Sequence, residues 1–104
     1  MKIQGSSQVL GQPVITTDGR RTGIVIRMRR RDDDPYTVTW MLIRLRGLRR
    51  RLRAVPAADA TVLPYRGVRV PYDRHQIIAS PPATDVTLGD PSWRHHTAAH
   101  YQNH

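Results

Sequence analysis

The sequence feature that most constrains the fold is a β-prone stretch at residues 36–46, in which the side chains alternate between two sets. Because successive side chains of a strand point to opposite faces, this stretch predicts one strand with two different faces. The face expected toward the core carries Thr39, Met41, Ile43 and Leu45. The opposite face carries Val38, Trp40, Leu42, Arg44 and Arg46. Both faces are partly apolar, so the strand is either covered on both sides within the chain or forms a contact surface for another chain.

Shorter stretches on either side repeat the alternation. At residues 23–30 the expected inward side chains are Ile24, Ile26 and Met28, and the opposite set is Val25, Arg27 and Arg29. At residues 49–55 the expected inward side chains are Leu52 and Ala54, and the opposite set is Arg51, Arg53 and Val55. The pattern therefore predicts a sheet with apolar side chains toward the core and arginines on the other face.

Turn-forming residues divide the first seventy residues into about six short strands. The turn signals lie at 17–20, 32–35, 47 and 64–67. The remaining β-prone stretches are 9–16, 61–63 and 68–70. Several short strands at short spacing predict an all-β fold, either a small barrel or a sandwich.

The last third of the chain carries helix signals instead. Asp73 followed by Gln76 is a variant of the capping box and predicts a short helix at 74–79. Asp90 followed by Pro91 predicts a second short helix at 92–101, after a polar linker. The expected organisation is a flexible N-terminus at 1–8, a β domain at 9–81, and a linker with a helical tail at 82–104.

Composition restricts the possible functions. The 104 residues include 17 Lys and Arg against 8 Asp and no Glu, which gives a net charge of +9, and residues 20–53 alone carry a net +9. Such a field favours anionic partners. The absence of Cys excludes disulfides, thiolate zinc sites and cysteine nucleophiles. The N-terminus has no apolar signal segment, and no apolar run reaches the ~18 residues of a membrane span, so we expect a cytoplasmic protein.

Four segments carry a resemblance to a known family. They are DGRRTGIV at 18–25, TWMLIRLRGL at 39–48, AVP at 54–56 and VPYDRHQIIASP at 70–81. In their order and spacing they resemble the PRC-barrel family, over roughly residues 9–81. The resemblance implies a compact β-barrel that serves as a contact module for protein or RNA, is often dimeric, and has no known catalytic residues in its stand-alone members.

The arginines are the first candidate site. If the three middle strands are neighbours, one sheet face presents Arg27, Arg29, Arg51 and Arg53 together with Arg44 and Arg46. Guanidinium groups suit phosphate because their planar fork donates two parallel hydrogen bonds. The face is either an anion-binding surface or a solvated basic surface. A nucleic acid could in addition stack an unpaired base on Trp40 or Tyr36.

Other candidate chemistry is weaker. His96, His100 and His104 recur at helical spacing, but no carboxylate lies near them, so we expect a polar tail and no metal site. Asp32, Asp33 and Asp34 are expected to form a solvated hairpin tip that balances the arginines before them. No nucleophile motif and no phosphate-binding loop is present, so we expect neither an enzyme nor a cofactor.

These observations predict a non-catalytic binding or scaffolding module that mediates protein–protein interaction as a homodimer or with another protein. The expected contact residues are Trp40, Leu42, Arg44 and Arg46. Trp40 could instead anchor the C-terminal segment. The alternative function is an RNA- or ribosome-associated factor that binds phosphate through the arginine face.

Overall fold

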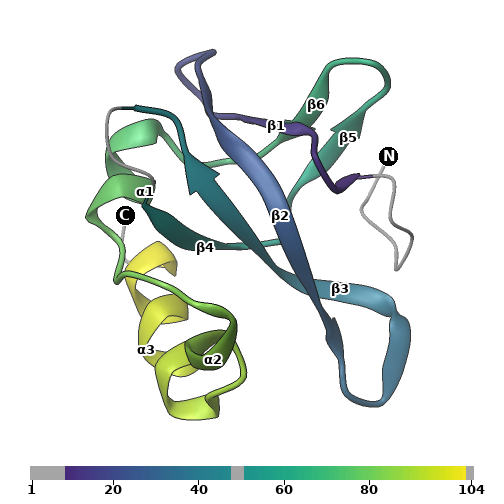
Figure 1. The fold of residues 1–104 in the computed structure, drawn as a ribbon, viewed down its shortest axis with the longest axis vertical. Helices are drawn as coiled ribbons and strands as arrows, with labels where there is room; N and C mark the ends of the chain where they lie inside the picture. Colours follow the sequence, from purple (N-terminus) through teal and green to yellow (C-terminus); the bar gives the residue numbers. More distant parts are fainter. Residues whose placement is uncertain (1–8, 48–50, 103–104) are drawn as a thin grey trace.

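The computed structural model describes residues 9–47 and 51–102, which form a mainly β structure followed by short helices (Figure 1). The strands are β1 (Pro13–Ile15), β2 (Arg21–Arg31), β3 (Asp34–Leu45), β4 (Leu52–Pro56), β5 (Thr61–Leu63) and β6 (Gly67–Arg69). The helices are α1 (Arg74–Ala79), α2 (Asp85–Leu88) and α3 (Pro91–Gln102). The expected N-terminal segment 1–8 lies outside the described residues.

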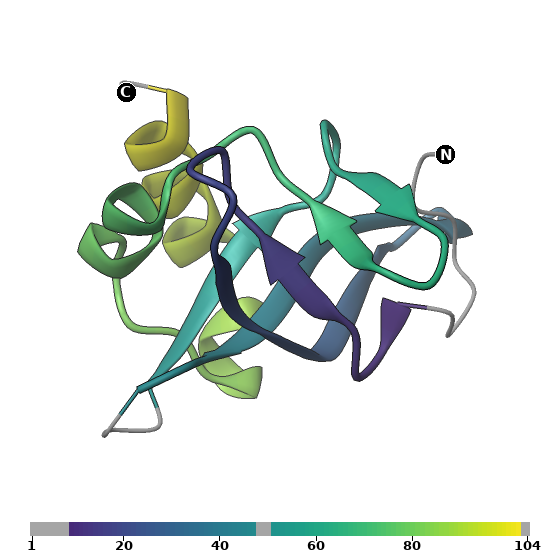
Figure 2. The same cartoon turned by 90° about the horizontal axis from the view of Figure 1, so that it is seen from above.

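The six strands form one mixed sheet in the order β4-β3-β2-β1-β6-β5. All neighbouring pairs are antiparallel except β1 and β6, which are parallel. No pairing joins β4 to β5 within the described ranges, so the sheet is open, whereas the strand pattern predicted a barrel or a sandwich and the family resemblance implied a barrel. Figure 2 shows the three helices gathered on one side, away from β5 and β6. None of the described helices is long and apolar enough to cross a membrane.

A β-bulge changes the alternation of β2. Val25 pairs with Ile43, and the next pair is Arg27 with Leu42, so Ile26 is an extra residue between them. Val25 therefore faces the core, with 1% of its surface exposed, while Ile24 and Ile26 are only half-buried. The prediction that Val25 faces away from the core is wrong, because the bulge shifts the phase of the strand.

The middle of strand β3 is buried on both faces. Met41 and Ile43 are fully buried on one face, and Leu42 is fully buried on the other. Helix α3 covers this second face: the rings of Trp40 and Trp93 lie with their centroids 6.3 Å apart. Of the two alternatives for a strand with two apolar faces, cover from within the chain is the one observed.

The helix caps follow the sequence signals. The Asp73 side chain accepts a hydrogen bond from the backbone N–H of Gln76 at 2.7 Å, and α1 begins at the next residue after this cap. Asp90 accepts from the backbone N–H of Ser92 at 3.0 Å, directly before α3. Both expected helices are thus confirmed. The expected linker contains a helix that was not predicted, α2, which Thr84 and Thr87 cap reciprocally.

Tyr101 fixes the C-terminal end of α3 to the sheet. Its hydroxyl group donates a 2.6 Å hydrogen bond to the carbonyl oxygen of Ala54. The centroid of its ring lies 4.6 Å from the centroid of the Tyr72 ring. Burial raises the pKa of Tyr101 from 10.0 to about 12. The folded chain therefore holds this phenolic proton more tightly than the unfolded chain does.

This pKa predicts a loss of stability at alkaline pH. The contribution of Tyr101 to stability is full below about pH 10, where its hydroxyl group is protonated in both the folded and the unfolded state. This contribution is lost between about pH 10 and 12, because in that interval only the unfolded state ionises. We expect the free energy of unfolding to fall by about 2 to 3 kcal/mol across this interval. Urea unfolding at about pH 8 and about pH 11.5 measures it. Tyr101→Phe should remove most of this pH dependence, and Tyr72→Phe should remove less of it. An unchanged pH dependence in Tyr101→Phe would contradict its assignment to Tyr101.

Candidate binding surface

The expected partner residues fall into two groups in the structure. Trp40 is 7% exposed and Leu42 is fully buried, because α3 and its preceding segment cover that face of β3. Arg44 is half-buried and Arg46 is exposed. Trp40 and Leu42 therefore belong to the core of the described chain and are not presented on its surface.

The expected anion-binding arginines do not form one face. Arg27 is exposed and forms an ion pair with Asp85 of α2 at 3.5 Å. Arg29 forms an ion pair with Asp32 at 3.1 Å. Arg51 is exposed, but Arg53 pairs in register with Ile43 and so points to the core side of the sheet. Arg27 and Arg29 lie opposite Leu42 and Trp40 and so share the face of Arg44, whereas the register of β4 places Arg53 on the other face.

Arg53 is the clearest departure from the predicted polarity. It is 7% exposed, and its guanidinium donates to the carbonyl oxygens of Leu52 at 2.9 Å and Ile78 at 3.4 Å. Burial lowers the pKa of Arg53, and the nearby Arg51 charge adds to this effect. Leu52, expected in the core, is only half-buried on the opposite face. The register between β3 and β4 inverts the predicted orientation of both residues.

The structure brings together three residues that the sequence separates. Arg44 pairs with Ile24 of β2 on one side and with Leu52 of β4 on the other. Cross-strand partners lie about 4.5–5.5 Å apart and on the same face, so the three side chains form one row across three strands. All three are half-buried. We call Ile24, Arg44 and Leu52 the open row, because it lies beyond the part of the face that contains Trp40 and Leu42.

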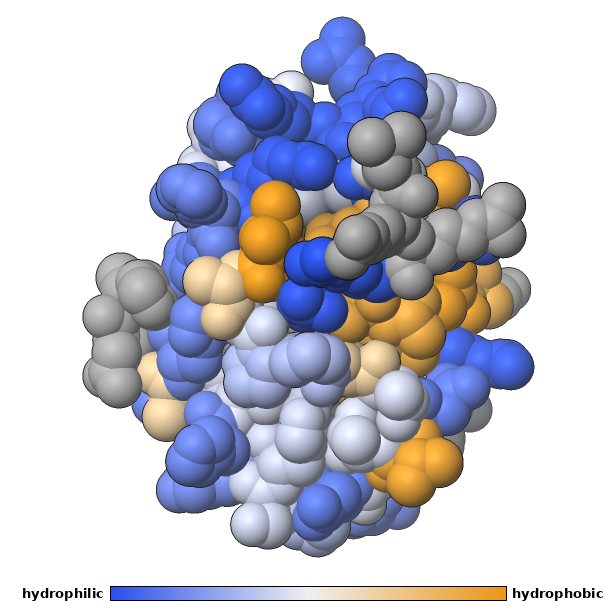
Figure 3. Space-filling model, turned by 60° about the vertical axis from the view of Figure 1, so that its left-hand side comes forward, coloured by the Kyte–Doolittle hydropathy of each residue, from blue (hydrophilic) through white to orange (hydrophobic). Residues whose placement is uncertain are grey.

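A hollow adjoins the open row at the outer edge of β4. Its volume is about 430 Å³, and it is lined by Arg51, Leu52, Arg53, Pro82, Ala83 and Thr84. The segment after α1 forms its far wall, since Pro82 forms a bridge with Arg53 and the backbone N–H of Ala83 donates to Leu52 at 3.2 Å. Figure 3, which turns the helical side forward, shows apolar surface in the middle of the view with hydrophilic surface above it.

Sequence reasoning missed this surface because it placed Ile24 and Leu52 in the core. The available signal was Arg44, which lies between these two residues in the sheet. A charged strand residue whose cross-strand neighbours are both apolar cannot be buried without a partner for its charge. Reading that signal requires the register of three strands. The linker residues 82–84 carried no sign of lining a hollow.

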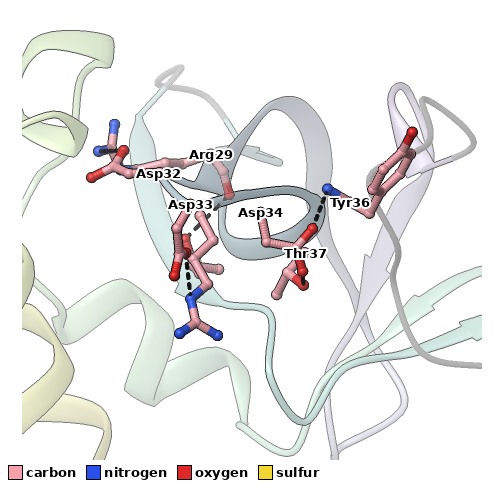
Figure 4. Close-up of polar contacts among 8 residues, drawn as sticks. Arg29, Asp32, Asp33, Asp34, Tyr36 and Thr37 are labelled. Atoms are coloured by element: carbon pink, nitrogen blue, oxygen red, sulfur yellow. Dashed lines mark hydrogen bonds and ion pairs between the residues drawn. The ribbon is translucent and has the colours of Figure 1, made fainter.

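The acidic segment forms the tip of the β2–β3 hairpin, as expected (Figure 4). Arg29 and Arg31 form ion pairs with Asp32 at 3.1 Å and Asp33 at 2.8 Å. Asp34 accepts hydrogen bonds from the Thr37 hydroxyl at 2.6 Å and the Tyr36 backbone N–H at 3.0 Å. These bonds lower the pKa of Asp34, with the Thr37 hydroxyl as the larger cause.

His96 and His100, the two described members of the C-terminal histidine set, have different surroundings. His100 lies with Nε2 2.8 Å from the carbonyl oxygen of Gln76, and His96 is exposed. His104 lies outside the described residues. Across residues 9–47 and 51–102, no three His or Asp side chains come together as metal ligands.

Comparison with known proteins gives no further assignment. No protein-family model matches the chain, and no curated protein matches it. The resemblance to the PRC-barrel family therefore stays a prediction from the four sequence segments.

Proposed function

We propose that the chain is a non-catalytic binding module that docks an acidic, partly apolar segment of another protein on the open row and in the hollow beside Leu52. The observation that carries the proposal is the combination of half-exposed Ile24 and Leu52 with Arg44 between them and a hollow at one end. Membership of the PRC-barrel family would agree with such a contact module.

Apolar side chains beside a hollow supply the attraction. Interface energy is concentrated in a few anchors that fill pockets and exclude water, and arginine is enriched among them. The hollow of about 430 Å³ is large enough for one apolar side chain of a partner. Leu52 forms one wall, and the aliphatic part of Arg51 can cover the inserted group.

Charge determines which partner fits. The open row contains Arg44, Arg51 lines the hollow, and Arg46 is exposed directly after the end of β3, the strand that carries Arg44. A carboxylate on the partner can accept two parallel hydrogen bonds from such a guanidinium. The chain as a whole carries +9, so its field accelerates encounter with an acidic protein.

A second copy of the chain fits this surface less well. A two-fold axis through the open row would bring Arg44 against Arg44 of the other copy, and two chains of net charge +9 repel each other. An RNA would use the arginines but would leave the apolar side chains of Ile24 and Leu52 without a complementary surface. Both alternatives predict results that the docking proposal does not.

Photo-crosslinking distinguishes the three partners. A benzophenone amino acid at position 52 of the full chain, irradiated in an extract of the source cells, should capture an acidic protein. The same residue at position 65 is the matched control, because Tyr65 is fully exposed in the β5–β6 turn. Equal capture at both positions, a product containing two copies of this chain, or a nucleic-acid product at position 52 would contradict the proposal.

A further inference from the structure

The hollow at the outer edge of β4 contains a buried cation. Arg53 lines this hollow and is 7% exposed, whereas Arg51, the other cation of the lining, is exposed. The carbonyl oxygen of Leu52 accepts from Nη1 of Arg53 at 2.9 Å and from the backbone N–H of Ala83 at 3.2 Å. Two donors on one oxygen lie close together, so the guanidinium lies at the strand edge, beside the segment that forms the far wall of the hollow.

The charge of Arg53 has no carboxylate partner among the described residues. None of the ion pairs that these residues form involves Arg53, and its two hydrogen bonds go to the carbonyl oxygens of Leu52 and Ile78. A carbonyl oxygen accepts a hydrogen bond but carries no net charge. Burial, and after it the charge of Arg51, lowers the pKa of this guanidinium, whereas a nearby carboxylate would raise it. A buried charge without a partner is costly, so an anionic ligand would stabilise it.

Part of the Arg53 guanidinium is available to such a ligand. The two hydrogen bonds use Nε and one N–H of Nη1, which are two of the five N–H groups. Nη2 donates to no described residue, and no enclosed side-chain nitrogen or oxygen of the described residues lacks a partner, so Nη2 reaches solvent. An oxygen atom that enters the hollow lined by this side chain can therefore accept from Nη2.

The rest of the lining favours a carboxylate over a phosphate group. Leu52, Pro82 and Ala83 contribute side chains without donors, and the hydroxyl group of Thr84 is engaged in the cap of α2. A phosphate monoester carries up to two charges and three free acceptor oxygens, which one buried guanidinium does not match. A carboxylate carries one charge on two oxygens, and it suits the fork of a single guanidinium.

Size and polarity together select the ligand further. The volume of about 430 Å³ falls within the ~300–1,000 Å³ of pockets that hold whole small ligands, so an apolar group and a carboxylate can enter together. The C-terminal residue of a protein supplies both, and its α-carboxylate is ionised at neutral pH. An internal Asp or Glu supplies a carboxylate without the apolar group, and its chain has to continue on both sides of the hollow.

We infer that the hollow binds the C-terminal residue of the partner protein, with its apolar side chain against Leu52 and its α-carboxylate on the guanidinium of Arg53. The inference rests on the proposed docking function and specifies which part of the partner is recognised. Arg51, exposed at the rim, attracts acidic residues that precede the terminus.

Fluorescence polarisation with the full chain tests this inference. The probes are N-terminally labelled pentapeptides with two internal Asp residues that end in Leu, Ile, Val or Phe. Each is prepared with a free C-terminal carboxylate, as the C-terminal amide, and as an amide extended by two Gly residues, which makes the apolar residue internal. We expect saturable binding of at least one free-carboxylate peptide, and its two amide forms should bind at least about tenfold more weakly. Equal affinities of the three forms, or no saturable binding of any free-carboxylate peptide, would overturn the inference.

Arg53→Gln separates carboxylate recognition from a structural role of the arginine. In this variant the free-carboxylate peptide should lose its preference over the amide, whereas a structural change would weaken both forms equally and preserve the preference. The matched control is Arg66→Gln, which removes an equal charge from the exposed β5–β6 turn and should keep the preference. The comparison of peptide forms on the wild-type chain tests the inference even if Arg53→Gln unfolds. A preference that persists in folded Arg53→Gln would overturn it.

Leu52→Ala distinguishes failure of this inference from failure of the proposed function. It removes the apolar wall without adding a charge, so it should weaken the free-carboxylate peptide by at least about fivefold. If docking occurs without recognition of the terminus, all three peptide forms bind the wild-type chain equally and Leu52→Ala weakens all of them. If docking itself fails at this surface, Leu52→Ala leaves every affinity unchanged.

Discussion

Replacement of Trp40 by Ala should destabilise the fold by about 3 to 5 kcal/mol, which is the usual cost of removing a buried tryptophan. Trp40 is 7% exposed, and its ring contacts Trp93, so the variant would leave a cavity between β3 and α3. A domain of this size has a total stability of about 5 to 15 kcal/mol, so the loss is a large fraction of it. The free energy of unfolding in urea measures the effect.

The same substitution should release α3. A helix of 12 residues is marginal in water on its own and depends on its contacts with the sheet. We therefore expect lower helical ellipticity in Trp40→Ala before the main urea transition. The matched control is Tyr36→Ala, an aromatic residue of the same strand that is 77% exposed, with an expected change within about 0.5 kcal/mol. Comparable losses in the two variants would show that α3 does not cover Trp40.

Replacement of Gly67 by Ala should destabilise the chain by about 3 to 5 kcal/mol. Gly67 has a φ of 135°, which L residues rarely adopt, and a Cβ atom there would lie 2.3 Å from the carbonyl oxygen of Pro13. That contact involves backbone of β1, so it can be relieved only by separating β1 from β6. The parallel pairing of these strands joins β5 and β6 to the rest of the sheet.

Substitutions at two other glycines separate the cost of the positive φ from the cost of the close Cβ contact. Gly19→Ala has a similar conformational cost, at φ 77°, but open space around the new Cβ, so we expect a loss of about 1 to 2 kcal/mol. Gly23→Ala has no positive φ, but its Cβ would lie 2.6 Å from the carbonyl oxygen of Arg44. Urea unfolding should rank Gly19→Ala as the mildest of the three. A loss in Gly67→Ala no larger than in Gly19→Ala would mean that β1 and β6 do not approach this closely.

Local signals in the sequence predicted the local structure well. Asp73 and Asp90 marked the starts of two helices because a cap is formed by residues within one turn of each other. The turn at 17–20 and the hairpin tip at 32–33 were visible for the same reason. Short-range hydrogen bonding decides these features, and the residues that make it are adjacent in the chain.

Features that depend on pairing between strands were not predictable in this way. The bulge at Ile26 and the inward orientation of Arg53 both follow from the register against β3, which alternation within one strand does not determine. Trp40 left two alternatives open because a buried face does not reveal whether its cover is α3 or another chain. The open row required the registers of both β2 and β4 against β3, so it became visible only in the folded structure.

The proposed function depends on the open row being the surface that binds a protein. The most direct test is the dissociation constant of the partner captured at position 52, measured with the wild-type chain and three variants. Leu52→Asp and Arg44→Glu should weaken binding at least about tenfold, because one removes the apolar wall and the other opposes the partner's charge. Tyr65→Asp, at an exposed site elsewhere, should change it by less than about twofold. Equal effects of all three variants, or unchanged affinity in Leu52→Asp, would contradict the account.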